Sequence, residues 1–154
     1  MHALEASGLA RFMREALYAY PLAEAAHIIG LGLLFGGIAV VDLRLLGLGR
    51  RLPVKPLLAL VVPWAVGGFF LAASTGILMF TAHADEFLVH PVFLVKMGLI
   101  LAGGCNAALL HAGPLATLPL DAGAVPPARV RIAAGLSLAL WVGVIVCGRL
   151  LAYL

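Results

Sequence analysis

Long apolar stretches recur four times along the chain. A membrane hydrocarbon core about 30 Å thick needs roughly 20 apolar residues per helix, and residues 22–46, 57–81, 92–112 and 129–153 reach that length. One or more prolines stand shortly before each stretch, as is common where helices begin. The pattern predicts an all-α fold, an integral membrane four-helix bundle that forms one domain.

The first 20 residues follow a different pattern. Apolar residues recur at helical spacing between Leu9 and Tyr20, whereas Arg11, Arg14 and Glu15 share the other face. These charges also interrupt the apolar core that a secretory signal peptide needs. Residues 1–20 are therefore predicted to form an amphipathic helix in the membrane interface.

Composition supports a membrane protein. Of the 154 residues, 64% are hydrophobic and only 11% are charged, whereas soluble domains carry about 25% charged residues. So few charges cannot cover a water-facing globule, which excludes a soluble enzyme, a disordered chain and a nucleic-acid-binding protein. The predicted partner of most of the surface is the lipid bilayer.

Loop charges predict how the bundle is oriented. Six basic residues lie in or beside the first and third connections, whereas the second connection, THADEFLVHP, has no Lys or Arg. Short cytoplasmic loops are enriched in Lys and Arg. We therefore predict a multi-pass protein of the bacterial inner membrane with both termini in the periplasm.

Small residues recur every fourth position within the spans, at Gly32 and Gly36, at Gly68, Ala72 and Gly76, and from Gly135 to Cys147. Such stripes allow helix backbones to approach closely, or leave a slot for a flat ligand. The stripe in the fourth span would also suit the interface of a homo-oligomer.

Ionisable residues inside the spans are the candidate functional groups, because a charge in the bilayer is costly. His27, Lys96 and Arg149 all fall roughly 7 to 9 Å below the outer boundary, at about 1.5 Å per residue. Glu24 lies one helical turn from His27. Three different spans thus place polar groups in one layer.

Two interpretations of this layer stay open. In the first, Glu24, Lys96 and Arg149 form a structural ion-pair cluster. In the second, the layer binds a non-covalent b-type haem, with His27 as one axial ligand. Arg149, with Tyr153 one turn further on, would then reach the haem propionates.

The sequence offers several candidates for the second axial ligand. Lys96 has the matching depth, although it would bind iron only as the neutral amine. His83 and His90 lie in the outer loop and are the alternatives. A copper site of His27, His83, His90 and Met79 is a third interpretation, since imidazole and thioether suit copper.

A second polar layer lies near the predicted cytoplasmic side. Its members are Asp42, Arg44, His111, Arg129 and Arg131. Charges at that depth can reach the headgroups, so we interpret them chiefly as ion pairs or topology signals, with a second site as the alternative.

Three stretches resemble a known family. AAHIIGLGLLFGGIAVVDLRLL, VVPWAVGGFFLAASTGILMF and HPVFLVKMGLILAGGCNAALLH are similar to the first, second and third helices of HemJ-type membrane protoporphyrinogen oxidases. The resemblance implies that His27 and Lys96 are haem b ligands. The pattern also resembles uncharacterised four-helix bacterial inner-membrane proteins and, more loosely, copper-resistance D proteins.

The sequence-based hypothesis is a membrane haem b protein that acts as an electron carrier or redox subunit, and a membrane oxidoreductase is the enzymatic form of that hypothesis. Its redox partner would be a quinone or a periplasmic redox protein. The alternatives are a non-enzymatic structural subunit, a transporter-like bundle, or a periplasmic copper-handling membrane protein.

Overall fold

The computed structural model describes residues 8–82, 84–117, 121–151 and 153. These residues form helices joined by turns, and no strand occurs among them. The elements are α2 (Gly8–Glu15), α3 (Ala19–Leu46), α4 (Val54–Ala82), α5 (Ala84–Val89), α6 (Pro91–Ala112), α7 (Pro114–Thr117) and α8 (Ala128–Leu150). The predicted all-α fold is confirmed.

Four of the helices, α3, α4, α6 and α8, are long and apolar enough to cross a membrane. Their exposed surfaces carry many large apolar side chains, among them Ile28, Leu60, Trp64 and Leu101, which is the surface expected where lipid is the solvent. The chain is therefore a multi-pass membrane protein built as a helical bundle.

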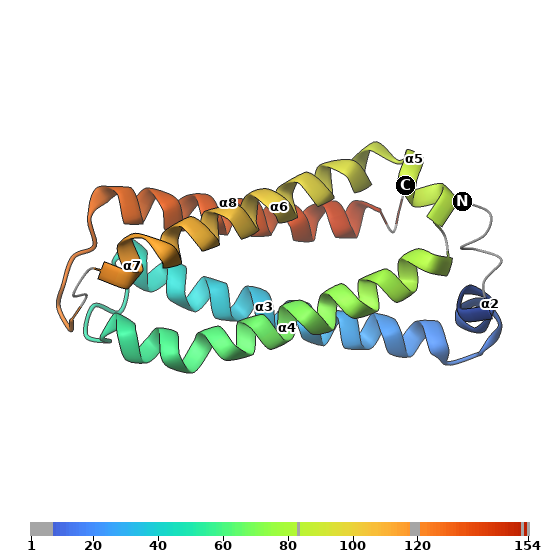
Figure 1. Ribbon diagram of the computed structural model, residues 1–154, viewed down its shortest axis with the longest axis horizontal. Helices are drawn as coiled ribbons and strands as arrows, with labels where there is room; N and C mark the ends of the chain where they lie inside the picture. The colour runs from blue at the N-terminus through green and yellow to red at the C-terminus, as the bar shows by residue number, and fades with distance from the viewer. Residues whose placement is uncertain (1–7, 83, 118–120, 152, 154) are drawn as a thin grey trace.

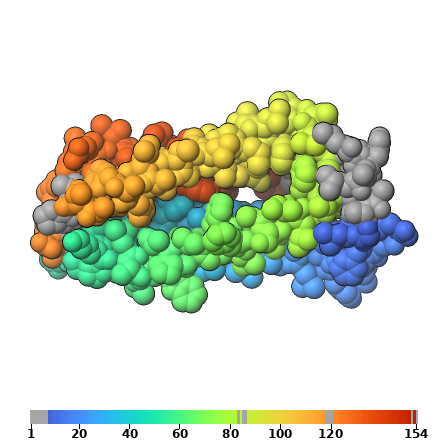
Figure 2. Space-filling model, viewed as in Figure 1, coloured from blue at the N-terminus to red at the C-terminus, as the bar shows by residue number. Residues whose placement is uncertain are grey.

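The bundle consists of two helical hairpins that lie side by side (Figure 1). α3 packs along α4, α6 packs along α8, and α3 also packs on α8. In contrast, the main chains of α4 and α6 lie apart, and Figure 2 shows an opening between these helices. Three neighbouring helix pairs are thus packed along the bundle, whereas α4 and α6 leave an opening between them.

The α3–α4 pair depends on a direct contact between backbones. A Cβ atom added at Gly30 would lie 2.7 Å from the Ala72 amide nitrogen, and one added at Gly68 would lie 2.7 Å from the Gly30 carbonyl oxygen. Only glycine permits such an approach. The two helices therefore cross with their main chains in contact, near the middle of both spans.

The helices begin earlier than the apolar pattern suggests. α3 starts three residues before position 22, and α4 starts three residues before position 57. Pro21 and Pro56 each occupy the third position of their helix, within the first turn. The first-turn amides have no partner within the helix, so a proline is tolerated there.

The small-residue stripes pack only in part as predicted. Gly68 and Ala72 lie at the α3–α4 contact, but within the described residues nothing lies within 4 Å of a Cβ built at Gly32 or Gly36. The partner glycine on α3 is Gly30. The prediction chose the wrong face of α3, because this helix has glycines on more than one face.

The N-terminal helix packs on the end of α4. Met13 is buried against a small cluster that includes Ala23 and Ala82, while Phe12 stays exposed. The Arg14 guanidinium donates a hydrogen bond of 3.1 Å to the Ala82 carbonyl oxygen. A cation at the C-terminus of a helix satisfies a free carbonyl and complements the helix dipole.

Arg44 stabilises the opposite end of the bundle, where the basic connections lie. This side chain is 2% exposed, and its Nε donates a 2.7 Å hydrogen bond to the Leu52 carbonyl oxygen. The chain leaves α3 through Gly47, whose φ of 111° favours glycine. Arg44 is therefore buried within the turn after α3 and does not extend toward the headgroups.

The Gly30 contact yields a stability prediction. Gly30→Ala should destabilise the protein by about 1–3 kcal/mol, because the added methyl group overlaps the α4 backbone. Gly32→Ala on the same helix is the control, and should be neutral or stabilising by up to about 1 kcal/mol, since alanine favours the helix more than glycine. Thermal unfolding in detergent would measure both. Equal effects would contradict the proposed contact.

Candidate functional site

Two cavities lie between the hairpins, on the side where α4 and α6 are apart. One has a volume of about 350 Å³ and is lined by His27 and Lys96; we call it the His27 cavity. The other has a volume of about 530 Å³ and is lined by Asp42 and His111; we call it the Asp42 cavity. They share four apolar wall residues, Leu34, Phe69, Ile100 and Trp141.

His27 is held by a hydrogen bond to the neighbouring helix. Its Nδ1 lies 2.8 Å from the Ala72 carbonyl oxygen and 3.1 Å from the Thr75 hydroxyl. A carbonyl oxygen can only accept, so Nδ1 carries the proton and donates. In the neutral ring Nε2 is then the unprotonated nitrogen, with a lone pair available to a ligand or metal.

The glycine contact explains how His27 reaches α4. His27 lies one helical turn before Gly30, on the same face of α3, and the main-chain contact at Gly30 brings Ala72 within its reach. Gly76 lies opposite the ring, where a Cβ atom would come within 3.3 Å of Cε1. The imidazole therefore occupies space left by the absent side chain of Gly76.

Lys96 comes from α6 and lines the same cavity. Its amine rests against α8, since Nζ lies 3.4 Å from the position of a Cβ atom built at Gly148. The lysine stem is long and flexible, so the amine can turn from Gly148 into the cavity. The structure thus brings two of the predicted site residues, His27 and Lys96, to the same cavity.

The remaining wall of the His27 cavity is almost wholly apolar, with side chains from all four spanning helices. Phe80 of α4 and Phe93 of α6 stack with ring centroids 5.5 Å apart, and both line the cavity. Phe87 of α5 stacks on both of these rings. This aromatic stack links α4 to α6 at the end near the termini.

Three other predicted site residues lie away from the cavity wall. Glu24 is exposed one turn from His27. Arg149 and Tyr153 are exposed as well; the guanidinium donates a hydrogen bond to the Tyr153 hydroxyl and lies over its ring. In this arrangement Arg149 and Tyr153 bind each other and do not line the cavity.

The charged residues of this layer are not paired with one another. Within the described part of the chain, no salt bridge links Glu24, Lys96 and Arg149, and the ion pair that is present joins Arg11 to Glu15 at 3.6 Å. These described residues therefore do not form the ion-pair cluster that was one of the two interpretations of this layer.

The alternative metal ligands do not gather around His27. His90 caps the start of α6 and lines neither cavity, and Met79 packs against the Met13 cluster. His83 lies outside the described residues. Among residues 8–82, 84–117, 121–151 and 153, no three His, Cys, Asp or Glu side chains are placed to hold a metal ion together.

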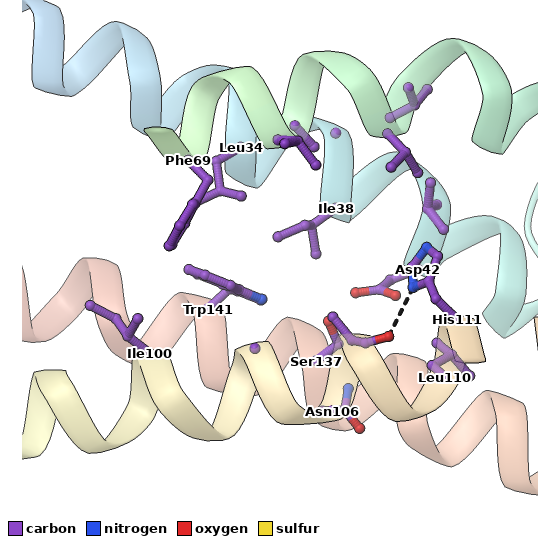
Figure 3. Close-up of a pocket in the computed structure, with 18 of the residues that line it drawn as sticks. Leu34, Ile38, Asp42, Phe69, Ile100, Asn106, Leu110, His111, Ser137 and Trp141 are labelled. Carbon is purple, nitrogen blue, oxygen red and sulfur yellow. Dashed lines mark hydrogen bonds between the residues drawn. The ribbon is translucent and has the colours of Figure 1, made fainter. Parts of the chain in front are cut away.

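Sequence reasoning underestimated Asp42. Its carboxyl was interpreted as a group near the headgroups, but it is 3% exposed and lies on the wall of the larger cavity, as Figure 3 shows. One signal was present in the sequence: Asp42 is the only acidic residue between Glu24 and Asp85. A single acidic residue near the end of a membrane span is costly, so its presence there indicates a specific contact.

Comparison with protein-family models, curated proteins and solved structures finds no match to this chain.

The hydrogen bond of His27 can be tested against the ion-pair interpretation. His27→Ala should destabilise the protein by about 1–2 kcal/mol, because a partly buried hydrogen bond and its packing are lost. Glu24→Gln is the matched control and should stay within about 0.5 kcal/mol of wild type, since Glu24 is exposed. Thermal unfolding in detergent, on protein freed of any cofactor, measures both. Equal destabilisation would support a charge network instead.

Proposed function

We propose that this protein is a bacterial inner-membrane haem b protein, an electron carrier or redox subunit with both termini in the periplasm. The observation that carries the proposal is the hydrogen bonding of the His27 ring, which determines which ring nitrogen holds the proton. Its Nδ1–H donates to the Ala72 carbonyl oxygen, which leaves Nε2 as the unprotonated nitrogen of a neutral histidine that lines an apolar cavity together with Lys96. Metal-binding histidines are usually oriented by this kind of second hydrogen bond.

The residues present fit a haem group in two respects. The apolar wall suits the porphyrin faces, and the absent side chains of Gly76 and Gly148 make room for the two candidate ligands, His27 and Lys96. No CxxCH motif is present in the sequence, so attachment would be non-covalent. When bound, haem supplies one-electron redox chemistry, whose potential depends on its axial ligands and surroundings.

The protein's own contribution would be ligation and exclusion of water. His27 and Lys96, the latter as the neutral amine, would hold the iron of the haem. The α3–α4 contact fixes the imidazole, whereas the lysine stem must turn away from Gly148. The opening between α4 and α6 faces the lipid, so bulk water is kept from the cavity by acyl chains as well as by protein.

Absorption spectra of the purified protein test the proposal. Protein from haem-replete cells should show a Soret band that shifts when dithionite is added, and His27→Ala should lose that band. Lys96→Leu should retain haem through His27 but change the spectrum, and added imidazole should restore a spectrum with two nitrogen ligands.

Two variants serve as controls. Lys55→Leu changes the only other lysine, in the first turn of α4, and His90→Ala changes a histidine outside the cavity. Both should keep the wild-type spectrum. A colourless wild-type preparation would contradict haem binding, and loss of the band in His90→Ala would reassign the ligand.

A further inference from the structure

The Asp42 cavity combines a polar end with an aromatic end. Figure 3 shows Asp42, His111 and Ser137 gathered at one end, with Phe69 and Trp141 toward the other. Asp42 belongs to α3, His111 to α6 and Ser137 to α8, and α4 supplies Phe69. All four spanning helices build the cavity, so it exists only in the assembled bundle.

Asp42 is the strongest sign that the polar end binds something. Ser137 interacts with the carboxyl group, but Oδ2 is buried and has no hydrogen-bond partner within the part of the chain that the structure describes. An unpaired buried carboxyl oxygen is costly, and native proteins almost always satisfy such atoms with protein, water or a ligand. A ligand group or a water molecule is needed beside Asp42.

His111 also lines this end of the cavity, although the residue itself is exposed. Its Nδ1 donates a hydrogen bond of 2.9 Å to the Ala107 carbonyl oxygen, so in the neutral ring Nε2 is unprotonated and can accept. No lysine or arginine lines the cavity among the described residues. The site therefore suits an uncharged hydroxyl donor and offers nothing to the phosphate group of a lipid.

The rest of the cavity suits a planar ring with an apolar tail. Phe69, Phe70 and Trp141 present aromatic side chains to it, and aromatic rings pack well against one another. The cavity lies where α4 and α6 are apart, so its mouth faces the acyl-chain region of the membrane. A ligand would reach it from within the lipid.

We propose that the Asp42 cavity binds the head group of a lipid-soluble quinol. A ring hydroxyl would donate a hydrogen bond to Asp42 or His111, the ring would lie against Phe69 and Trp141, and the tail would leave between α4 and α6. This inference goes beyond haem binding and does not depend on it.

Binding of two probes tests the proposal. Decylubiquinol, kept reduced under nitrogen, carries the ring hydroxyls, whereas decylbenzene has a ring and the same tail without them. Each is titrated against the full-length protein in phosphatidylcholine nanodiscs, with empty nanodiscs as the blank. Wild type should bind decylubiquinol at least tenfold more tightly than decylbenzene, because only the quinol can donate to Asp42 or His111.

Substitutions at two glycines of α6 test whether decylubiquinol binds in this cavity. Among described residues, nothing lies within 4 Å of a Cβ atom built at Gly104 or Gly98, but only Gly104 lines the cavity. Gly104→Leu should fill the cavity and weaken binding of decylubiquinol at least tenfold, whereas Gly98→Leu should stay within twofold of wild type. Equal losses in the two variants would overturn the proposal.

Two further variants examine head-group recognition. At least one of Asp42→Leu and His111→Leu should weaken decylubiquinol binding about tenfold, and both should leave decylbenzene within twofold. If wild type binds both probes equally, the cavity takes acyl chains only and the proposal fails, whatever the variants do. His27→Ala should still bind decylubiquinol, so loss of haem and loss of quinol binding are separate outcomes.

Discussion

The contact between the α3 and α4 backbones at Gly30 and Gly68 is the constraint on which the rest of the site depends. Lipid removes most of the hydrophobic incentive for helices to associate, so close main-chain packing must supply it. The same contact sets the distance and rotation at which His27 meets the Ala72 carbonyl. A bulkier residue at Gly30 or Gly68 would therefore change the bundle and the imidazole together.

The second constraint is the separation of α4 from α6. Three helix pairs are packed and this fourth one is not, which leaves two cavities in line along the bundle, divided by Leu34, Phe69, Ile100 and Trp141. The first cavity is lined by a histidine whose Nε2 is unprotonated in the neutral ring, and the second by the buried carboxyl group of Asp42, whose Oδ2 has no hydrogen-bond partner among the described residues. A redox group in the first and a membrane-dissolved quinol in the second would lie in adjacent compartments of one small protein.

Sequence predicted some of this arrangement and missed the rest for a physical reason. Depth along a helix follows from residue number, so the shared layer of His27 and Lys96 could be predicted, as could the four-helix fold. The direction of a side chain depends on how its helix is rotated, and packing decides that. For this reason Arg149 and Glu24 have the expected depth but lie off the cavity, and Gly30 makes the contact expected of Gly32. Asp42 was interpreted from its depth alone.

The central claim is that His27 and the cavity around it bind an iron porphyrin. Elemental analysis of the protein purified from iron- and copper-replete cells tests this claim most directly, because iron, copper and neither metal correspond to different functions. We expect about one iron atom per chain, and this iron should be extracted together with a haem that is not covalently attached. Copper at that ratio, or no metal at all, would contradict this claim.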